Sequence, residues 1–248
     1  MSDIPESGGP VAAETISDLA AASRILAAQG VVDGFGHVSI RHPDASDRYL
    51  LSRSMAPALV TPSDIIEYDL VSNAVNAEGR GGFLERFIHG QIYRARPDIN
   101  AVVHTHSPSV IPFGLVGCEM RAMFHNAAFI AEGVPVFDIS EDFGDTDMLV
   151  SDNGKGVALA AVMNGKNVVL MRGHGAVACG ATLQMAVFRA AYTEVNARIQ
   201  HWTNALADGG PIAALSKEEG ALADVPNEAA CMRAWSLWRS EISETVDW

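Results

Sequence analysis

The sequence has few cysteines, no long hydrophobic run and no excess of basic residues. Its three cysteines (Cys118, Cys179 and Cys231) are widely spaced and form no Cys-x-x-Cys motif, which argues against a disulfide scaffold and a cysteine-based zinc site. No apolar run approaches the roughly 18 residues of a transmembrane helix. The polar start of the chain lacks the basic and apolar segments of a signal peptide. We therefore expect a protein of the reducing cytoplasm, with no membrane partner.

The net charge of the chain limits the kinds of molecule that it is expected to bind. The 17 Lys and Arg residues against 30 Asp and Glu residues give a net charge of −13. This argues against a nucleic-acid partner, because such proteins rely on basic surfaces. A small-molecule carboxylate remains compatible, since a metal ion and local arginines can set a positive field around it. Hydrophobic residues make up 48% of the 248-residue chain, which is typical of a globular protein.

The hydrophobic pattern alternates between helical and strand periods, with no internal repeat. Helices are predicted over 13–29, 83–94, 152–163 and 182–206, with a short one starting at Thr61, and strands over 36–41, 49–52, 69–74, 101–106, 135–138 and 167–172. This alternation favours one α/β domain with strands between helices. We expect that domain to occupy residues 13–248, with a C-terminal helical extension, after a flexible tail over residues 1–12.

The segment Ala101-Val102-Val103-His104-Thr105-His106 is the most informative of the chain. Side chains two apart on a strand point to the same face, so His104 and His106 share a face. Two such imidazoles suit two ligands of one metal ion. The pair alone fits a strand with two hydrogen-bonded histidines equally well.

Two further residues extend this candidate site. His174 lies between Gly173 and Gly175 after an apolar strand, where glycines permit close approach of backbone and ligand. Glu85 falls early in the predicted helix that leads into the His-x-His strand. Taken alone, His174 fits a turn histidine and Glu85 a helix-end charge. Together, three imidazoles form a facial set that leaves positions open for substrate, as catalytic sites do. Zn²⁺ is the ion we expect, and Mn²⁺, Fe²⁺ and Co²⁺ also suit the ligands.

Three blocks of this sequence resemble the class II aldolase/adducin superfamily. They are Gly36-His37-Val38-Ser39, the stretch from Gly82-Phe83-Leu84-Glu85 through His104-Thr105-His106-Ser107, and Gly173-His174-Gly175 with Gly180 ahead of a long helix. The resemblance spans roughly residues 14–205. It implies a three-layer α/β/α fold with a central, mainly antiparallel sheet. It also implies one divalent metal on His104, His106 and His174, with Glu85 as a further ligand or an acid/base, in a homotetramer.

Departures from the family pattern point away from sugar phosphates. His37 replaces an Asn of the first block, and Asp64 replaces a Gly of the phosphate-binding Thr-Pro-Ser-Gly. An acidic residue there would repel a phosphate dianion. Arg53 could instead bind a carboxylate through two parallel hydrogen bonds, although it fits a surface arginine equally well. Ser52 and Ser63 are the accompanying candidates for substrate binding.

This pattern resembles the branch of the superfamily that decarboxylates hydroxylated aromatic or pyridine carboxylates. The resemblance implies a metal-dependent lyase in which Glu85, His37 and His125 are the candidate proton donors to carbon. One alternative is an aldolase that acts on a non-phosphorylated or carboxylate-bearing substrate. Another is an adducin-like interaction module without catalysis, against which the complete set of metal-ligating residues argues.

Overall fold

The computed structural model describes residues 4–243. In chain order its elements are α1 (Ala13–Ala28), β1 (His37–Arg41), β2 (Arg48–Ser52), η1 (Pro57–Leu59), η2 (Pro62–Asp64), β3 (Ile65–Asp69), α2 (Phe87–Ala95), β4 (Ala101–Thr105), η3 (Ile111–Gly114), η4 (His125–Ile130), β5 (Val136–Phe137), α3 (Ile139–Phe143), α4 (Asn153–Met163), β6 (Val168–Met171), β7 (Gly175–Gly180), α5 (Leu183–Ala207) and α6 (Lys217–Ser243). The η elements are short 3₁₀ helices.

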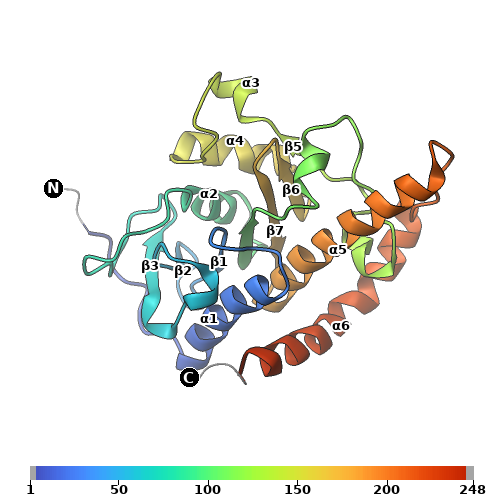
Figure 1. Ribbon diagram of the computed structural model, residues 1–248. Coiled ribbons are helices and arrows are strands. Elements are labelled where there is room, and N and C mark those ends of the chain that lie inside the picture. The colour runs from blue at the N-terminus through green and yellow to red at the C-terminus, as the bar shows by residue number, and fades with distance from the viewer. Residues whose placement is uncertain (1–3, 244–248) are drawn as a thin grey trace.

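One seven-stranded sheet, in the order β3-β2-β1-β4-β7-β6-β5, forms the middle layer. All neighbouring strands are antiparallel except β5 and β6, which are parallel. Helices α1, α5 and α6 lie on one side of the sheet, and α2, α3 and α4 lie on the other (Figure 1). The predicted α/β/α fold with a mainly antiparallel sheet is therefore confirmed.

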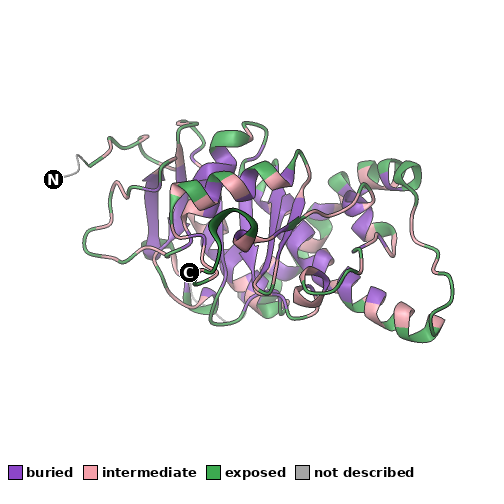
Figure 2. Ribbon diagram, turned by 90° about the horizontal axis from the view of Figure 1, so that it is seen from above, coloured by how far each residue is buried: buried purple, intermediate pink, exposed green. Residues whose placement is uncertain are grey.

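Each face of the sheet has its own hydrophobic core, as the buried strands in Figure 2 illustrate. Val103 and Ala101 of β4 pack toward α1 and α5, whereas Val102 packs toward α2 and α4. This alternation follows from the period-two geometry of a strand covered on both faces. Both cores hold the central strand β4 in place, so the residues at its end are rigidly positioned.

The structure differs from the sequence-based expectations at two strands, β3 and β7. β3 covers Ile65–Asp69 instead of the predicted 69–74, and Ala74 forms a bridge to Tyr68. The segment Gly175–Gly180 is strand β7, which the sequence did not predict because Gly and Ala have low strand propensity. Pairing with β4 on one side and β6 on the other overrides that propensity.

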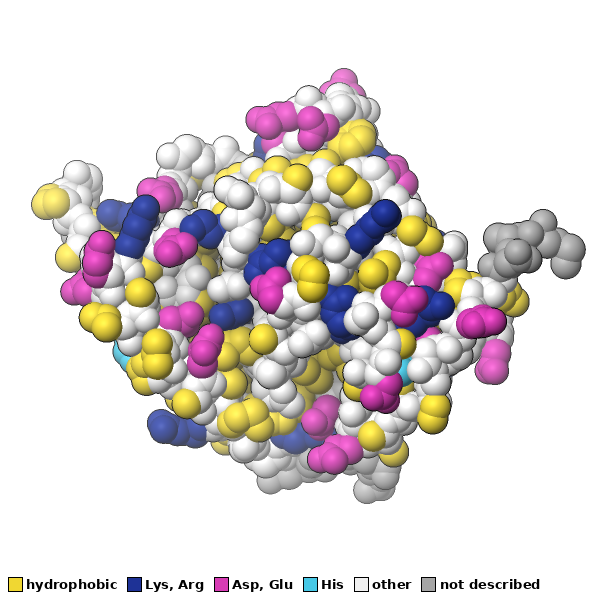
Figure 3. Space-filling view, turned by 180° about the vertical axis from the view of Figure 1, so that it is seen from behind, with side chains coloured by type: hydrophobic (Ala, Val, Ile, Leu, Met, Phe, Trp, Pro, Cys, Tyr) yellow, Lys and Arg dark blue, Asp and Glu magenta, His cyan; other side chains and the backbone are white. Residues whose placement is uncertain are grey.

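The two ends of the described chain pack against the domain. Residues 4–12 form no helix or strand, yet the Ser7 hydroxyl and the Gly8 amide both donate to the carboxylate of Glu67, at 2.7 and 2.6 Å. Helix α6, the predicted C-terminal extension, packs on η4, α5 and α1. No helix within residues 4–243 is long and apolar enough to cross a membrane. On the face shown in Figure 3, acidic and basic side chains are interspersed, without a continuous basic surface.

Candidate metal centre

Three histidines converge at one end of the sheet. His104 lies in β4 and is fully buried, and His106 follows the end of that strand. His174 lies in the turn between β6 and β7, and β7 pairs with β4. The antiparallel pairing brings the end of β4 beside the start of β7. It therefore unites residues that are far apart in the sequence.

Glu85 completes the cluster from a turn rather than from a helix. The sequence predicted a helix from Phe83, but α2 begins at Phe87, so Glu85 precedes it. The Glu85 carbonyl accepts from Ile88 N at 3.1 Å, and one carboxylate oxygen accepts from Val150 N at 3.0 Å. These bonds fix the carboxylate while its second oxygen faces the histidines.

The distances among the four side chains fit one metal ion. His106 Nε2 lies 3.1 Å from His104 Nε2 and 3.0 Å from His174 Nε2. Glu85 Oε2 lies 3.3 Å from both His104 Nε2 and His174 Nε2. Ligands of one zinc ion, at bond lengths of about 2.0–2.2 Å, lie about 2.8–3.6 Å apart. The four residues are thus suited to one divalent ion with three nitrogen ligands and one oxygen ligand.

A hydrogen bond orients the His174 ring toward the cluster. Its Nδ1 donates to the Met148 carbonyl at 3.0 Å, which leaves the Nε2 lone pair directed at the cluster. His104 Nδ1 is buried without a hydrogen-bond partner among residues 4–243. Three imidazole nitrogens facing one another require a cation or shared protons between them.

The electrostatics of the cluster favour bound positive charge. Burial by itself would raise the pKa of Glu85, but the His104 and His174 imidazoles hold that pKa far below its usual value. Burial, together with repulsion from His104 and His174, lowers the pKa of His106 to about 4. Glu85 is therefore ionised and His106 neutral at pH 7. These are the protonation states that metal binding needs.

A cavity of about 320 Å³ opens beside the cluster, and Glu85, His104 and His106 form part of its wall. The rest of the lining is mostly apolar: Phe35, Met55, Ala56, Phe83, Leu84 and Leu149, with His37, Ser54 and two glycines. The Phe35 ring stacks toward the His106 ring, with centroids 6.0 Å apart. A cavity with an apolar wall and a few polar groups at one end is typical of small-molecule sites.

The predicted substrate-binding residues are not part of the wall of this cavity in the described part of the chain. Within residues 4–243 the lining includes Ser54 but not Ser52, Arg53 or Ser63. The Nε of Arg53 donates to Asp64 Oδ1 at 2.6 Å, and Ser52 is buried at the end of β2. Ser63 is exposed, and its Oγ lies 2.9 Å from Thr61 Oγ1.

Asp64 has a structural role that the sequence analysis did not anticipate. Its carboxylate accepts from the Thr61 amide at 2.9 Å and from Arg53, so it caps the short helix η2. Burial opposes ionisation, but the hydrogen bonds from Arg53 and Thr61 lower the pKa of Asp64 overall. Because Arg53 balances its charge, Asp64 alone is a weaker argument against phosphate than the sequence indicated.

The other two predicted catalytic residues, His37 and His125, lie in different places relative to the cavity. His37 begins β1, pairs in register with His104 and lines the cavity. His125 begins η4, is exposed, and hydrogen-bonds through Nδ1 to Asn126 Oδ1 at 2.9 Å. It is not among the described residues that line this cavity.

Sequence reasoning missed a group of buried residues behind His37: Ser39, His89 and Tyr93. A signal for them exists in the sequence. Ser39 follows His37 by two positions on one strand, and His89 and Tyr93 are four apart on helix α2, so each pair shares a face.

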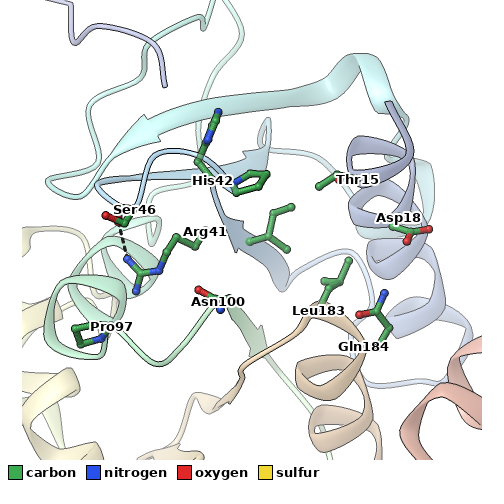
Figure 4. Close-up of a pocket in the computed structure, with 11 residues that line it drawn as sticks. Thr15, Asp18, Arg41, His42, Ser46, Pro97, Asn100, Leu183 and Gln184 are labelled. Atoms are coloured by element: carbon green, nitrogen blue, oxygen red, sulfur yellow. Dashed lines mark hydrogen bonds between the residues drawn. The ribbon is translucent and has the colours of Figure 1, made fainter. Parts of the chain in front are cut away.

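A second cavity, of about 510 Å³, lies at the opposite ends of β1 and β4 (Figure 4). Arg41 contributes to its wall but donates to the carbonyls of Ser46, Tyr93, Arg96 and Ile99. His42 is likewise held by backbone groups of Gly9 and Asp44. Because these polar groups are already bound within the protein, the metal centre is the better candidate site.

Comparison with known proteins agrees with this geometry. The model of the "Class II Aldolase and Adducin N-terminal domain" family matches residues 17–201. The chain is 33% identical to "Decarboxylase tropJ" of Talaromyces stipitatus, covering 88% of this chain and 90% of that protein. It is 30% identical to the 3,4-dihydroxyphthalate decarboxylase of Arthrobacter keyseri, covering 91% of each.

The fold is similar to that of an aldolase II superfamily protein from Pseudomonas syringae. That crystal structure aligns with a TM-score of 0.78 over 96% of this chain and 95% of the other, at 21% identity. The family model covers most of the chain, and the structural likeness extends over nearly all of it. The chain therefore belongs to the family of class II aldolase and adducin N-terminal domains.

Proposed function

We propose that this protein is a divalent-metal-dependent lyase that decarboxylates a hydroxylated aromatic or pyridine carboxylate. The observation that carries the proposal is the cluster of Glu85 and three histidines, which opens onto a cavity with an aromatic and aliphatic wall. Two relatives that match about nine-tenths of the chain are named decarboxylases, and one of them is named for an aromatic dihydroxy dicarboxylate. This supports the choice of decarboxylation among the reactions of the family.

Different residues would bind the metal, transfer protons and enclose the substrate in such a reaction. His104, His106 and His174 would hold the metal, which would supply Lewis-acid stabilisation of the negative charge left when CO₂ departs. Glu85 is a fourth ligand in the resting site, or an acid/base once substrate takes its place. The apolar wall formed by Phe35, Phe83 and its neighbours excludes water and accepts an aromatic ring.

Two tasks remain for residues around the cluster, namely holding the substrate carboxylate and delivering a proton to carbon. Arg53, with Ser52 and Ser63, is our candidate for the first, since only its Nε is bound to Asp64 in the described structure. Glu85 and His37 face the cavity and are candidates for the second. His125 lies outside the cavity of its own chain, so its role in proton delivery requires a neighbouring subunit.

Three finer points belong to the same proposal. We infer Zn²⁺ as the ion, with Mn²⁺, Fe²⁺ or Co²⁺ as substitutes that the same ligands accept. We infer a homotetramer, as the family resemblance implies. Free thiols at Cys118, Cys179 and Cys231 are consistent with a reducing cytoplasm.

The test is to purify the protein, measure its metal content and supply ortho-hydroxy aromatic acids. We expect about one divalent ion per chain and release of CO₂ that a chelator abolishes and zinc restores. His104→Ala should lose the ion and the activity together. Release of an aldehyde from hydroxy acids without CO₂ would show an aldolase instead. Absence of both bound metal and chelator-sensitive activity would reject catalysis altogether.

A further inference from the structure

A chain of short hydrogen bonds leads from His37 into the protein interior. His37 Nδ1 lies 2.6 Å from His89 Nε2, and His89 Nδ1 lies 2.6 Å from Ser39 Oγ. Ser39 Oγ also lies 2.7 Å from Tyr93 Oη. All four side chains are buried, and His37 is the one that lines the cavity.

The chain contains one more hydrogen than it has hydrogen bonds. Each neutral imidazole carries one N–H and each hydroxyl one O–H, so four hydrogens serve three bonds. Burial, together with repulsion from His104, lowers the pKa of His89 to about 3, which keeps that ring neutral. One hydrogen must therefore point outside the chain. Its position depends on the direction in which the bonds run.

Only one direction leaves no buried donor without an acceptor. If His37 Nδ1 donates to His89, the surplus hydrogen is left on Ser39 or Tyr93. Neither hydroxyl has a further hydrogen-bond acceptor among residues 4–243. If Tyr93 donates to Ser39, Ser39 to His89 and His89 to His37, the surplus hydrogen lies on His37 Nε2, at the cavity. An unsatisfied buried donor is costly, so the second direction is favoured.

We propose that Ser39 and His89 are positioning residues that hold His37 in the tautomer with its proton on Nε2, and that Tyr93 ends the chain by donating to Ser39. His37 then offers the cavity a fixed hydrogen-bond donor beside the metal centre, where its ring centroid lies 5.1 Å from that of His104. Helix α2 supplies His89 and Tyr93, and strand β1 supplies Ser39. The donor is thus held by two elements of the rigid core.

A donor at this place favours an anionic or hydroxyl oxygen of the substrate. This consequence rests on the proposed function, in which the substrate carries both groups. His37 is less suited to giving its proton away, because the ring would become an imidazolate unless Nδ1 received a proton along the chain. The far end of the chain is Tyr93, whose pKa burial raises well above its usual value, so it resists losing a proton. Of the two roles considered for His37, the geometry therefore favours substrate binding over proton delivery, and it leaves protonation of carbon to another group.

The tautomer can be read directly from the full chain loaded with zinc and labelled with ¹⁵N-histidine. Two-bond ¹H–¹⁵N correlation spectra distinguish a proton on Nε2 from one on Nδ1, and a His37→Asn variant identifies the His37 signals. We expect the proton on Nε2 at neutral pH. A proton on Nδ1, or on both ring nitrogens, would overturn the proposal.

Two variants test whether the buried hydroxyls set the tautomer of His37 or only fill space in the core. Each variant removes one hydroxyl group. Tyr93→Phe leaves Ser39 free to donate to His89, so the His37 tautomer should be unchanged. Ser39→Ala deprives His89 Nδ1 of its donor, so His37 should become a mixture of both tautomers. A purely structural role predicts no such contrast, and an unchanged spectrum in Ser39→Ala would contradict the proposal. If that variant does not fold, the wild-type and Tyr93→Phe spectra still decide the matter.

A kinetic contrast should accompany the spectra once a substrate is found. In a mixture of tautomers only the rings with a proton on Nε2 can donate to the substrate, so an even mixture weakens binding by about twofold. We therefore expect KM to rise by about twofold in Ser39→Ala, and to stay unchanged in Tyr93→Phe. Equal KM values in the two variants would count against the positioning role. Absence of CO₂ release from every protein would reject the proposed function, whereas the tautomer spectra would stand independently.

Discussion

Gly175 offers a sharp test of how the fold sets the metal centre. It follows His174 and begins β7, where a Cβ atom would lie 1.8 Å from the Thr105 carbonyl oxygen and 2.9 Å from the Thr105 carbonyl carbon. Real Cβ atoms essentially never come closer than 3.0 Å to another heavy atom. Gly175→Ala therefore requires β4 and β7 to separate by about 1 Å. No flexible side chain can absorb the change, because the obstacle is backbone.

The expected loss of stability follows from this clash. Overpacking of a core costs about 1–3 kcal/mol, and a clash with backbone belongs at the upper end, near 3 kcal/mol. For a chain of this size, that corresponds to a fall in Tm of about 6–12 °C. Separation of the strands also moves His106 relative to His174. We therefore expect zinc to raise the Tm of Gly175→Ala less than it raises the Tm of the wild type.

The assay is thermal unfolding of both proteins with and without added zinc. Gly117→Ala is the matched control, because Gly117 is exposed and a Cβ there would meet no atom within 4 Å. Its Tm should stay within about 2 °C of the wild type. The reasoning fails if Gly175→Ala melts as the control does and shows the full zinc-induced rise in Tm.

Three further predictions address charge and binding. Glu85→Gln keeps the size of the side chain but removes its charge, so zinc affinity measured by calorimetry should fall at least about tenfold; an unchanged affinity would remove Glu85 from the ligand set. The pKa of His89 is about 3 in the folded protein, below its usual value of 6.5, so its contribution to stability is full above pH 6.5 and is lost as the pH falls toward 3. Between pH 7.5 and 5.0 this lowers the free energy of unfolding of the metal-free protein by about 2 kcal/mol. Measured by urea unfolding, the free energy of unfolding of His89→Gln should fall by about 2 kcal/mol less than that of the wild type over the same pH range. An equal fall in both proteins would show that His89 does not titrate in this range. Arg53→Ala should raise KM and leave kcat nearly unchanged if Arg53 binds the substrate carboxylate, whereas unchanged values of both would assign Arg53 to its pairing with Asp64 alone.

The sequence by itself determined the features that depend on local pattern. The apolar, β-branched segment that begins at Ala101 predicted a strand with His104 and His106 on one face, and the structure has β4 over Ala101–Thr105, with His106 directly after it. The Thr61-Pro62-Ser63-Asp64 segment predicted a short capped helix, because its capping residues act within one turn. Helices α1, α4 and α5 likewise follow predicted segments closely, since each has a continuous helical pattern.

Tertiary structure decided the features that depend on contacts between distant segments. β7 is a strand because it fills the space between β4 and β6, although its Gly- and Ala-rich sequence does not favour one. The pairing of Asp64 with Arg53, and the chain from His37 through His89 to Tyr93, depend on how β1, β2 and α2 pack. Local propensity carries no information about such pairings, because they are fixed by burial and hydrogen-bond satisfaction across the whole domain. The sequence thus indicated which residues suit a metal, whereas the packing decided how the residues around this candidate site are oriented.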